Sequence, residues 1–128
     1  INDFVGGIKI LLAPGGVVTM EFPQLLHLIE RSYWDTIYHE HFSYLSFTTV
    51  EQIFASHGLV LFDVDEIPTH GGSIRIYGRH AEDARKPVHD RVAAMKGREL
   101  QAGHADLSYY ENFGERVKES KRSILEFL

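Results

Sequence analysis

The chain has 128 residues, enough for one domain with its own core, and its hydrophobic content of 44% excludes a disordered protein. The absence of cysteine excludes disulfides, zinc–thiolate sites and cysteine nucleophiles, and the net charge of −5 disfavours nonspecific binding to nucleic acid or anionic membranes. No apolar run is long enough to span a bilayer, so we expect a cytoplasmic protein without nucleic-acid or membrane partners. Eight histidines are unusual for this length, and a first residue, Ile1, that is not methionine suggests a fragment.

The first thirty residues predict a helix, a tight turn, a strand and a second helix. Residues 3–12 place apolar side chains on one helical stripe, with Asp3 as the cap: Phe4, Ile8, Leu11 and Leu12. Pro14-Gly15-Gly16 ends this helix, and the β-branched run at 17–22 predicts a strand buried on at least one face. A leucine-rich helix begins at Leu25. This order is one crossover step of a doubly wound α/β sheet.

Residues 32–47 have no helical or strand period but concentrate aromatic, histidine and acidic side chains. Because ligands bind outside the carboxyl ends of strands in α/β proteins, a site is expected in such a segment. A third helix follows, with Thr48 and Thr49 as candidate N-caps and Glu51 in a capping box. His57-Gly58 ends it. Its predicted apolar face consists of Val50, Ile53 and Phe54.

Two further strands are predicted, followed by helices. Residues 59–67 alternate, which gives one drier face formed by Val60, Phe62 and Val64. Residues 73–79 alternate apolar Ile74 and Ile76 with polar neighbours. The five residues between the two strands are too few for a parallel crossover, so the strands are expected to be antiparallel neighbours. After Lys86 the chain is charged and helical.

These periods alone predict an α/β fold whose sheet ends in an antiparallel strand. A parallel strand followed by a helix and an antiparallel hairpin is also the arrangement that closes the sheet of Rossmann-like class I methyltransferases. We therefore expect the C-terminal part of such a sheet, followed by helices.

The densest cluster of proton-handling groups is Tyr38-His39-Glu40-His41. Histidine titrates near neutral pH and can accept a proton, a carboxylate can orient its ring, and tyrosine can donate to an oxygen that becomes an enolate. These residue types suit removal of a proton next to a ketone. The alternative is a polar loop with surface histidines.

A metal site is a second interpretation of the histidines. His39 and His41 lie on one face if the segment is extended, and His70 could supply a third ligand of a metal-dependent hydrolase. The spacing matches no zinc-protease motif, so no metal ligand is predicted. The turn His70-Gly71-Gly72-Ser73 joins two strands, and its backbone N–H groups could hold a phosphate or a carbonyl oxygen.

Three stretches resemble the sugar C-methyltransferases, which act on nucleotide-linked deoxysugars. They are residues 20–30 (MEFPQLLHLIE), 35–44 (DTIYHEHFSY) and 68–73 (PTHGGS). The resemblance implies S-adenosylmethionine as the cofactor of the complete enzyme. It also implies a cysteine-rich zinc segment, the Gly-rich cofactor loop and a final domain, all of which this chain lacks. The fragment is therefore expected to bind S-adenosylmethionine weakly and to be inactive alone.

The resemblance also implies residue roles. His41 is the general base that removes a proton from the carbon beside the 4-keto group, and Glu40 and Tyr38 orient the base and the sugar. His70, Gly71, Gly72 and Ser73 line the sugar side. Residues 1–80 are expected to be the end of the methyltransferase core, and residues 81–128 a helical segment leading to an absent second domain. A third class of function is a non-catalytic assembly module that self-associates through surfaces exposed by truncation.

Overall fold

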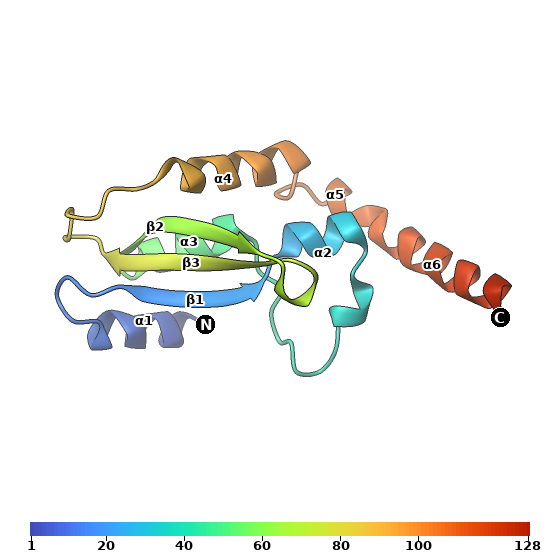
Figure 1. Cartoon of the computed structure of the whole chain (residues 1–128), viewed down its shortest axis with the longest axis horizontal. Coiled ribbons are helices and arrows are strands. Elements are labelled where there is room, and N and C mark those ends of the chain that lie inside the picture. The colour runs from blue at the N-terminus through green and yellow to red at the C-terminus, as the bar shows by residue number, and fades with distance from the viewer.

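The computed structural model describes residues 1–128 apart from the side chain of His70 (Figure 1). Short 3-10 turns lie at Trp34–Thr36 and Thr69–Gly71. The helices and strands, in chain order, are α1 (Asn2–Leu11), β1 (Val18–Pro23), α2 (Leu25–Arg31), α3 (Phe47–Ser56), β2 (Leu59–Ile67), β3 (Ser73–His80), α4 (Asp90–Ala102), α5 (Ser108–Glu111) and α6 (Phe113–Phe127).

The three strands form one sheet in the order β1-β3-β2, and both neighbouring pairs are antiparallel. Ile76 in the central strand lies opposite Met20 on one side and Val64 on the other. The predicted α/β class and the antiparallel hairpin are therefore confirmed. Within the described residues β1 has no parallel partner strand, so the expected parallel pairing stays a prediction. Because both outer strands oppose β3, β1 and β2 run in the same direction.

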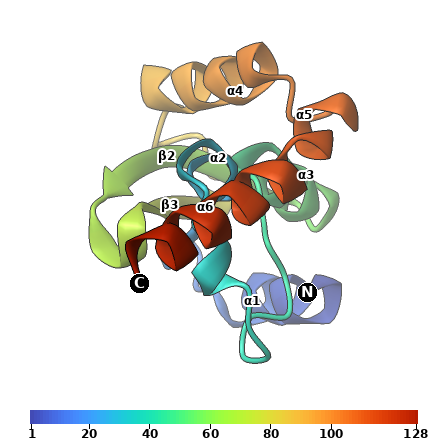
Figure 2. The same ribbon diagram turned by 90° about the vertical axis from the view of Figure 1, so that its right-hand side faces the viewer.

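One apolar cluster fills the space between the sheet and the helices α1, α3 and α4. Looking along the sheet, α3 lies on one side of it, with α4 above and α1 below (Figure 2). The buried members of this apolar cluster are Val5, Phe47, Val50, Phe54, Leu59, Leu61, Val64, Ile74, Ile76, Val92 and Met95. The other face of the sheet carries polar pairs across strands, such as the bond that Tyr77 donates to Asp65 at 2.8 Å, and the Phe62 ring lies beside Tyr77 on the same face.

The helix α1 is rotated relative to its predicted orientation. Val5 is buried in the core, whereas Phe4 and Leu11 are 59% and 85% exposed. Residues 5, 8 and 12 form a stripe that is as regular as the predicted one and shares two of its members, and this is the stripe that faces the core. The predicted cap was also wrong, because Asp3 lies within the first turn and no side chain caps the helix.

The predicted dry face of β2 is confirmed only at Val64 and is wrong at Val60 and Phe62. A β-bulge between Leu61 and Asp63 shifts the register, so the faces exchange halfway along the strand. Leu59 and Leu61 are buried before the bulge and Val64 after it, while Phe62 is only half-buried. Strict alternation could not predict this change of face.

The start of α3 depends on residues other than the predicted caps. Ser46 is the N-cap, and its Oγ accepts from the Thr49 N–H at 3.1 Å. Glu51 makes no capping box, because its carboxylate pairs with Lys96 of α4 at 2.9 Å. The helix nevertheless forms where the sequence predicts it. The predicted apolar face is confirmed, because Val50 and Phe54 are buried and Ile53 is half-buried against the core.

The carboxylate of Glu99 joins α4 to the beginning of α3. The side chain is fully buried, and its two oxygens accept from the backbone N–H of Phe47 at 2.7 Å and of Thr48 at 2.8 Å. The Thr48 hydroxyl donates to it at 2.7 Å, and the side-chain amide of Gln24 donates at 3.1 Å. A negative charge at a helix N-terminus is favourable, and these donors compensate for its burial.

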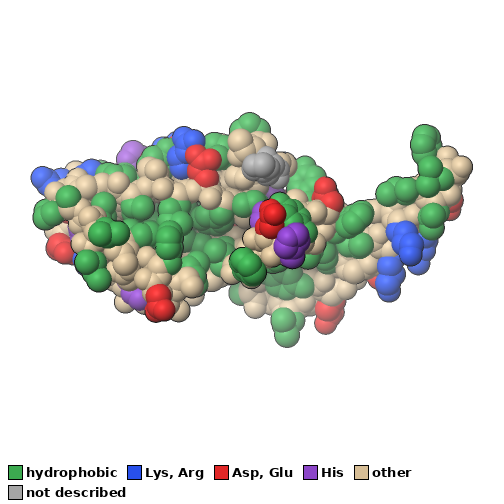
Figure 3. Space-filling model, turned by 90° about the horizontal axis from the view of Figure 1, so that it is seen from below, with side chains coloured by type: hydrophobic (Ala, Val, Ile, Leu, Met, Phe, Trp, Pro, Cys, Tyr) green, Lys and Arg blue, Asp and Glu red, His purple; other side chains and the backbone are tan. Residues whose placement is uncertain are grey.

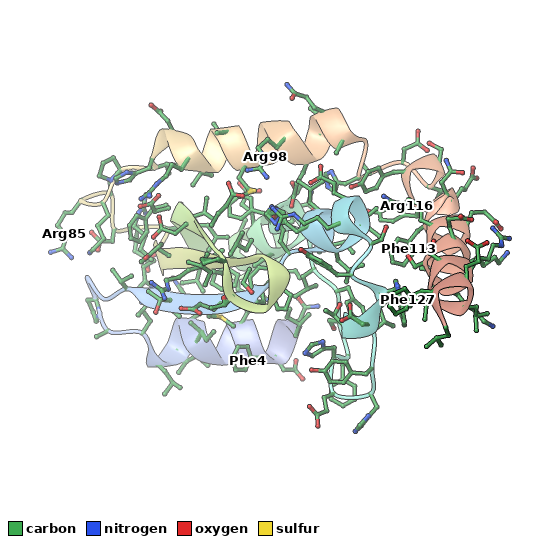
Figure 4. The ribbon with its side chains drawn as sticks, turned by 45° about the vertical axis from the view of Figure 1, so that its right-hand side comes forward. Phe4, Arg85, Arg98, Phe113, Arg116 and Phe127 are labelled. Atoms are coloured by element: carbon green, nitrogen blue, oxygen red, sulfur yellow. The ribbon has the colours of Figure 1, made fainter. Side chains whose placement is uncertain are left out.

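The long helix α6 is attached near its beginning and projects away from the sheet (Figure 1). Arg116 points from α6 toward α2 (Figure 4), where its guanidinium donates to the backbone carbonyls of Ile29 and Glu30. Cations at the last carbonyls of a helix are stabilising. Farther along, Ile124, Leu125 and Phe127 are exposed. In the described part of the chain no helix has the length and hydropathy needed to cross a bilayer.

We predict that Glu99→Ala lowers the free energy of unfolding by about 2–4 kcal/mol, because it removes the acceptor of the buried Phe47 N–H and of the half-buried Thr48 N–H and takes one of two acceptors from the buried Gln24 amide. Glu51→Ala removes a half-exposed ion pair of similar chemistry and should cost less than about 1 kcal/mol. Urea unfolding followed by circular dichroism measures both. Equal losses in the two variants would show that Glu99 contributes no more than a surface pair.

Candidate functional site

The polar and aromatic segment 32–46 leaves the end of α2 and returns to the start of α3. Its return is fixed at the carboxyl end of β1, where the Leu25 N–H donates to the Leu45 carbonyl at 3.1 Å. Gln24 and Leu45 also form an isolated β-bridge of parallel type, outside the three strands. The site predicted at the end of the first strand therefore has a defined position, at the carboxyl end of β1.

His41 is held in one orientation inside this segment. Its Nδ1 lies 2.9 Å from the backbone carbonyl oxygen of Thr36, which can only accept a hydrogen bond, so Nδ1 carries the hydrogen. In the neutral ring Nε2 is then the acceptor, and the Tyr38 hydroxyl lies 3.2 Å from it. The Tyr38 and His41 rings are 4.3 Å apart between centroids. The contacts thus leave the basic nitrogen of His41 facing a hydroxyl group.

The other predicted members of the cluster are not in contact with the His41 ring nitrogens. Glu40 and His39 are exposed, and no described side chain pairs with Glu40. Hydrophobic residues around them are exposed too, with Tyr38 at 45% and Phe42 at 94%. The face seen in Figure 3 shows histidine and acidic side chains among hydrophobic ones where this segment projects. His41 itself lines a cavity of about 50 Å³ with Phe22, Pro23 and Tyr44.

The turn at 68–72 lies at the same end of the sheet. The Gln24 N–H donates to the Gly72 carbonyl at 3.3 Å, so the residue directly after β1 connects to the turn, while its neighbour Leu25 connects to the His41 segment. Ser73 is buried and donates to the Thr69 carbonyl at 3.0 Å. The side chain of His70 lies outside the described residues. The hydrogen bonds of His41 with described residues go to Thr36 and Tyr38 and not to this turn.

His27 and Arg31 of α2 support this turn, a role that no pattern in the sequence predicts. Arg31 donates to the Gly71 carbonyl at 2.8 Å. The His27 ring is buried against Gly72, with Nε2 lying 3.3 Å from a Glu66 oxygen and 3.3 Å from an Arg98 nitrogen. Burial, followed by the nearby positive charge of Arg31, lowers the pKa of His27 below 6.5. Within its leucine-rich helix, His27 carries no pattern that would single it out.

The described residues do not favour the metal interpretation. They contain no group of three or more histidine and acidic side chains placed to share an ion. Both ring nitrogens of His41 are engaged, so a metal would have to displace Thr36 or Tyr38. The third proposed ligand, His70, falls outside the described side chains.

The described residues also do not form a cradle for S-adenosylmethionine. Such a cradle is a Gly-rich turn between a strand and the N-terminus of a helix. Here Gly15 and Gly16 lie between a helix and β1, and Gly71 and Gly72 lie between two antiparallel strands. No residue of this chain is therefore assigned to the cofactor.

Two comparisons bear on the family. A family model described as "C-methyltransferase C-terminal domain" matches residues 68–128. The chain is also 38% identical to the C-methyltransferase NovU of Streptomyces niveus, in an alignment that covers 98% of this chain. The resemblance to C-methyltransferases is confirmed. The chain spans 30% of the length of that relative, so the activity of a whole C-methyltransferase is a proposal for it.

Gly72→Ala should destabilise the turn beside the site. Gly72 has φ +131°, and a Cβ there would lie 2.5 Å from Nδ1 of the buried His27. Backbone strain and overpacking together predict a loss of about 2–4 kcal/mol. The matched change Gly114→Ala, in an open position of α6, should change stability by less than about 1 kcal/mol. A Gly72→Ala protein as stable as the wild type in urea unfolding would contradict the observed packing.

His27 should make stability depend on pH. Its pKa is lower in the folded than in the unfolded protein, so between the two values the unfolded state binds more protons. Stability is then fully present above about pH 6.5 and falls as the pH decreases through that region. Unfolding free energies between pH 5.5 and 7.5 should fall less steeply toward acid for His27→Gln than for the wild type. Identical slopes would exclude His27 as the source.

Proposed function

We propose that this chain carries the proton-abstracting part of an S-adenosylmethionine-dependent C-methyltransferase. Its substrate is a nucleotide-linked 4-keto deoxysugar, methylated at the carbon next to the keto group. The observation that carries the proposal is the orientation of His41, whose Nδ1–H is committed to Thr36 and whose basic Nε2 faces, among the described residues, only the Tyr38 hydroxyl, a partner that can move away from it. The strand arrangement supports it, because β1 and β2 run in one direction with antiparallel β3 between them, as expected at the end of a Rossmann-like sheet.

The first step is proton transfer to His41. Nε2 takes the proton from the carbon beside the ketone, and the electron pair of that C–H bond moves to form an enolate whose negative charge rests on the former keto oxygen. The imidazolium that forms keeps its Nδ1–H bond to the Thr36 carbonyl. The ring therefore needs no rotation when it changes charge.

Tyr38 must change partners during this step. Its hydroxyl now donates to Nε2, the atom that has to receive the substrate proton. An enolate oxygen next to the reacting carbon offers a stronger acceptor, so the hydroxyl turns to it as the charge develops. S-adenosylmethionine would supply the electrophilic methyl group. The sugar-side role of residues 70–73 is supported by their place at the same end of β1.

Fewer contacts support the roles of the other predicted residues. Glu40 was predicted to orient the base, but Thr36 is the residue in contact with Nδ1. Glu40 could still act on the substrate side, where it is exposed. The metal-dependent hydrolase is not favoured, and the assembly module and the cytoplasmic location stay predictions.

His41→Asn in the full-length protein should abolish exchange of the substrate proton with deuterated solvent and lower methyl transfer by about 10²–10⁴-fold. His39→Asn is the matched control, because it alters the neighbouring exposed histidine and should leave exchange near the wild-type rate. Mass spectrometry of the recovered sugar measures the exchange directly. Exchange that persists in His41→Asn would exclude His41 as the base.

A further inference from the structure

A second hollow adjoins the His41 cavity and shares Tyr44 with it. It has a volume of about 510 Å³ and lies between the start of α3, the end of α4 and the segment that follows. Cavities of this size are typical of small-molecule sites, whereas the 50 Å³ around His41 hold little more than a water molecule or a methyl group. A substrate that reaches His41 therefore needs the larger hollow for the bulk of a ring. Its lining includes Tyr44, Thr49, Gln52, Lys96, Gly97 and Tyr110.

The lining combines aromatic faces with neutral polar groups. Tyr44 and Tyr110 contribute rings, and the hydroxyl of Tyr110 is fixed by donating to the His104 carbonyl at 2.6 Å. Gln52 makes no hydrogen bond to the described residues, and Thr49 accepts from Ser46, which leaves its own hydroxyl hydrogen available. A pyranose presents apolar C–H faces and a rim of hydroxyl groups, which is the complement of such a lining.

The basic side chains of this hollow, Lys96 and His104, already have partners. Lys96 pairs with Glu51 at 2.9 Å, and Nδ1 of His104 donates to the Glu99 carbonyl at 2.9 Å. The first amides of α3, which could otherwise bind an anion, donate to the Glu99 carboxylate. A diphosphate would find no unpaired cation here among the described residues. The lining thus suits an uncharged ring and not the nucleotide.

We infer that this hollow holds the uncharged glycosyl ring of the substrate, with its reacting edge toward His41. The identity of the substrate rests on the proposed function. Tyr44 and Tyr110 cover the apolar faces of the ring, and Thr49 and Gln52 bind its hydroxyl groups.

Gly97 offers a direct test, because it lines the hollow and a Cβ there meets no atom within 4 Å. Gly97→Leu fills the hollow while favouring the helix. In the full-length protein it should raise KM for a nucleotide-linked 4-keto-6-deoxyhexose by about tenfold or more while kcat changes little. Gly97→Ala should have a smaller effect in the same direction. Gly114→Leu, an equally open glycine of α6, should leave KM unchanged.

Binding probes separate this inference from the proposed function. Saturation-transfer NMR with millimolar methyl 6-deoxy-α-D-glucopyranoside should show binding to the wild type and to Gly114→Leu but not to Gly97→Leu. All three proteins should unfold at nearly the same urea concentration, so that a loss of glycoside binding reflects the filled hollow and not a damaged fold. A glycoside that fails to bind the wild type, or that binds Gly97→Leu equally well, overturns the assignment. Glycoside binding that depends on Gly97 in a protein that methylates no sugar would overturn only the proposed function.

Discussion

The arrangement of the site depends on one buried carboxylate. Glu99 belongs to α4, yet it caps α3 by accepting from the Phe47 and Thr48 amides, and it also accepts from the side chain of Gln24. Gln24 and Phe47 stand just before and just after the excursion that contains α2, the predicted catalytic segment and the return to α3. Glu99 therefore fixes both ends of this excursion. A buried charge of this kind is tolerated because each oxygen has donors and because the helix N-terminus is itself positive.

This contact also explains why the C-terminal helices matter to a site that precedes them in the sequence. The family model covers residues 68–128, which include Glu99 and the turn at Gly72, whereas His41 lies outside that range. Gln24, which also lies outside that range, nevertheless links the two parts of the chain. Its backbone N–H donates to the Gly72 carbonyl, and its side chain donates to Glu99. The boundary expected at residue 80 stays a prediction. The hydrogen bonds of Glu99 cross this boundary. A chain truncated after residue 80 would therefore lose the acceptor that holds the two ends of the His41 segment in place.

Much of the fold could be predicted because local patterns agreed with long-range packing. The β-branched run after Pro14-Gly15-Gly16 predicts β1, and the short link between residues 67 and 73 predicts the antiparallel pairing of β2 with β3. The failures have local causes. Two equally good stripes competed in α1, and the bulge at Phe62 changed the faces of β2 without any signal in the residue types. Glu99 was missed because an acidic residue in a charged helix is normally solvated, and only the tertiary structure buries it.

Inside the site, too, the residue types predicted the participants but not their pairing. Glu40 adjoins His41 in sequence, and a carboxylate is a common partner of a histidine base. The chain instead turns so that the Thr36 carbonyl, five residues back, accepts from Nδ1. A carbonyl fixes the tautomer without adding a negative charge next to the ring. If His41 is the base, its imidazolium is then stabilised mainly by charge that the substrate brings, because the enolate forms beside it. Such a base gains its counter-ion only when the reacting carbon is in place, which confines the charged pair to the moment of reaction.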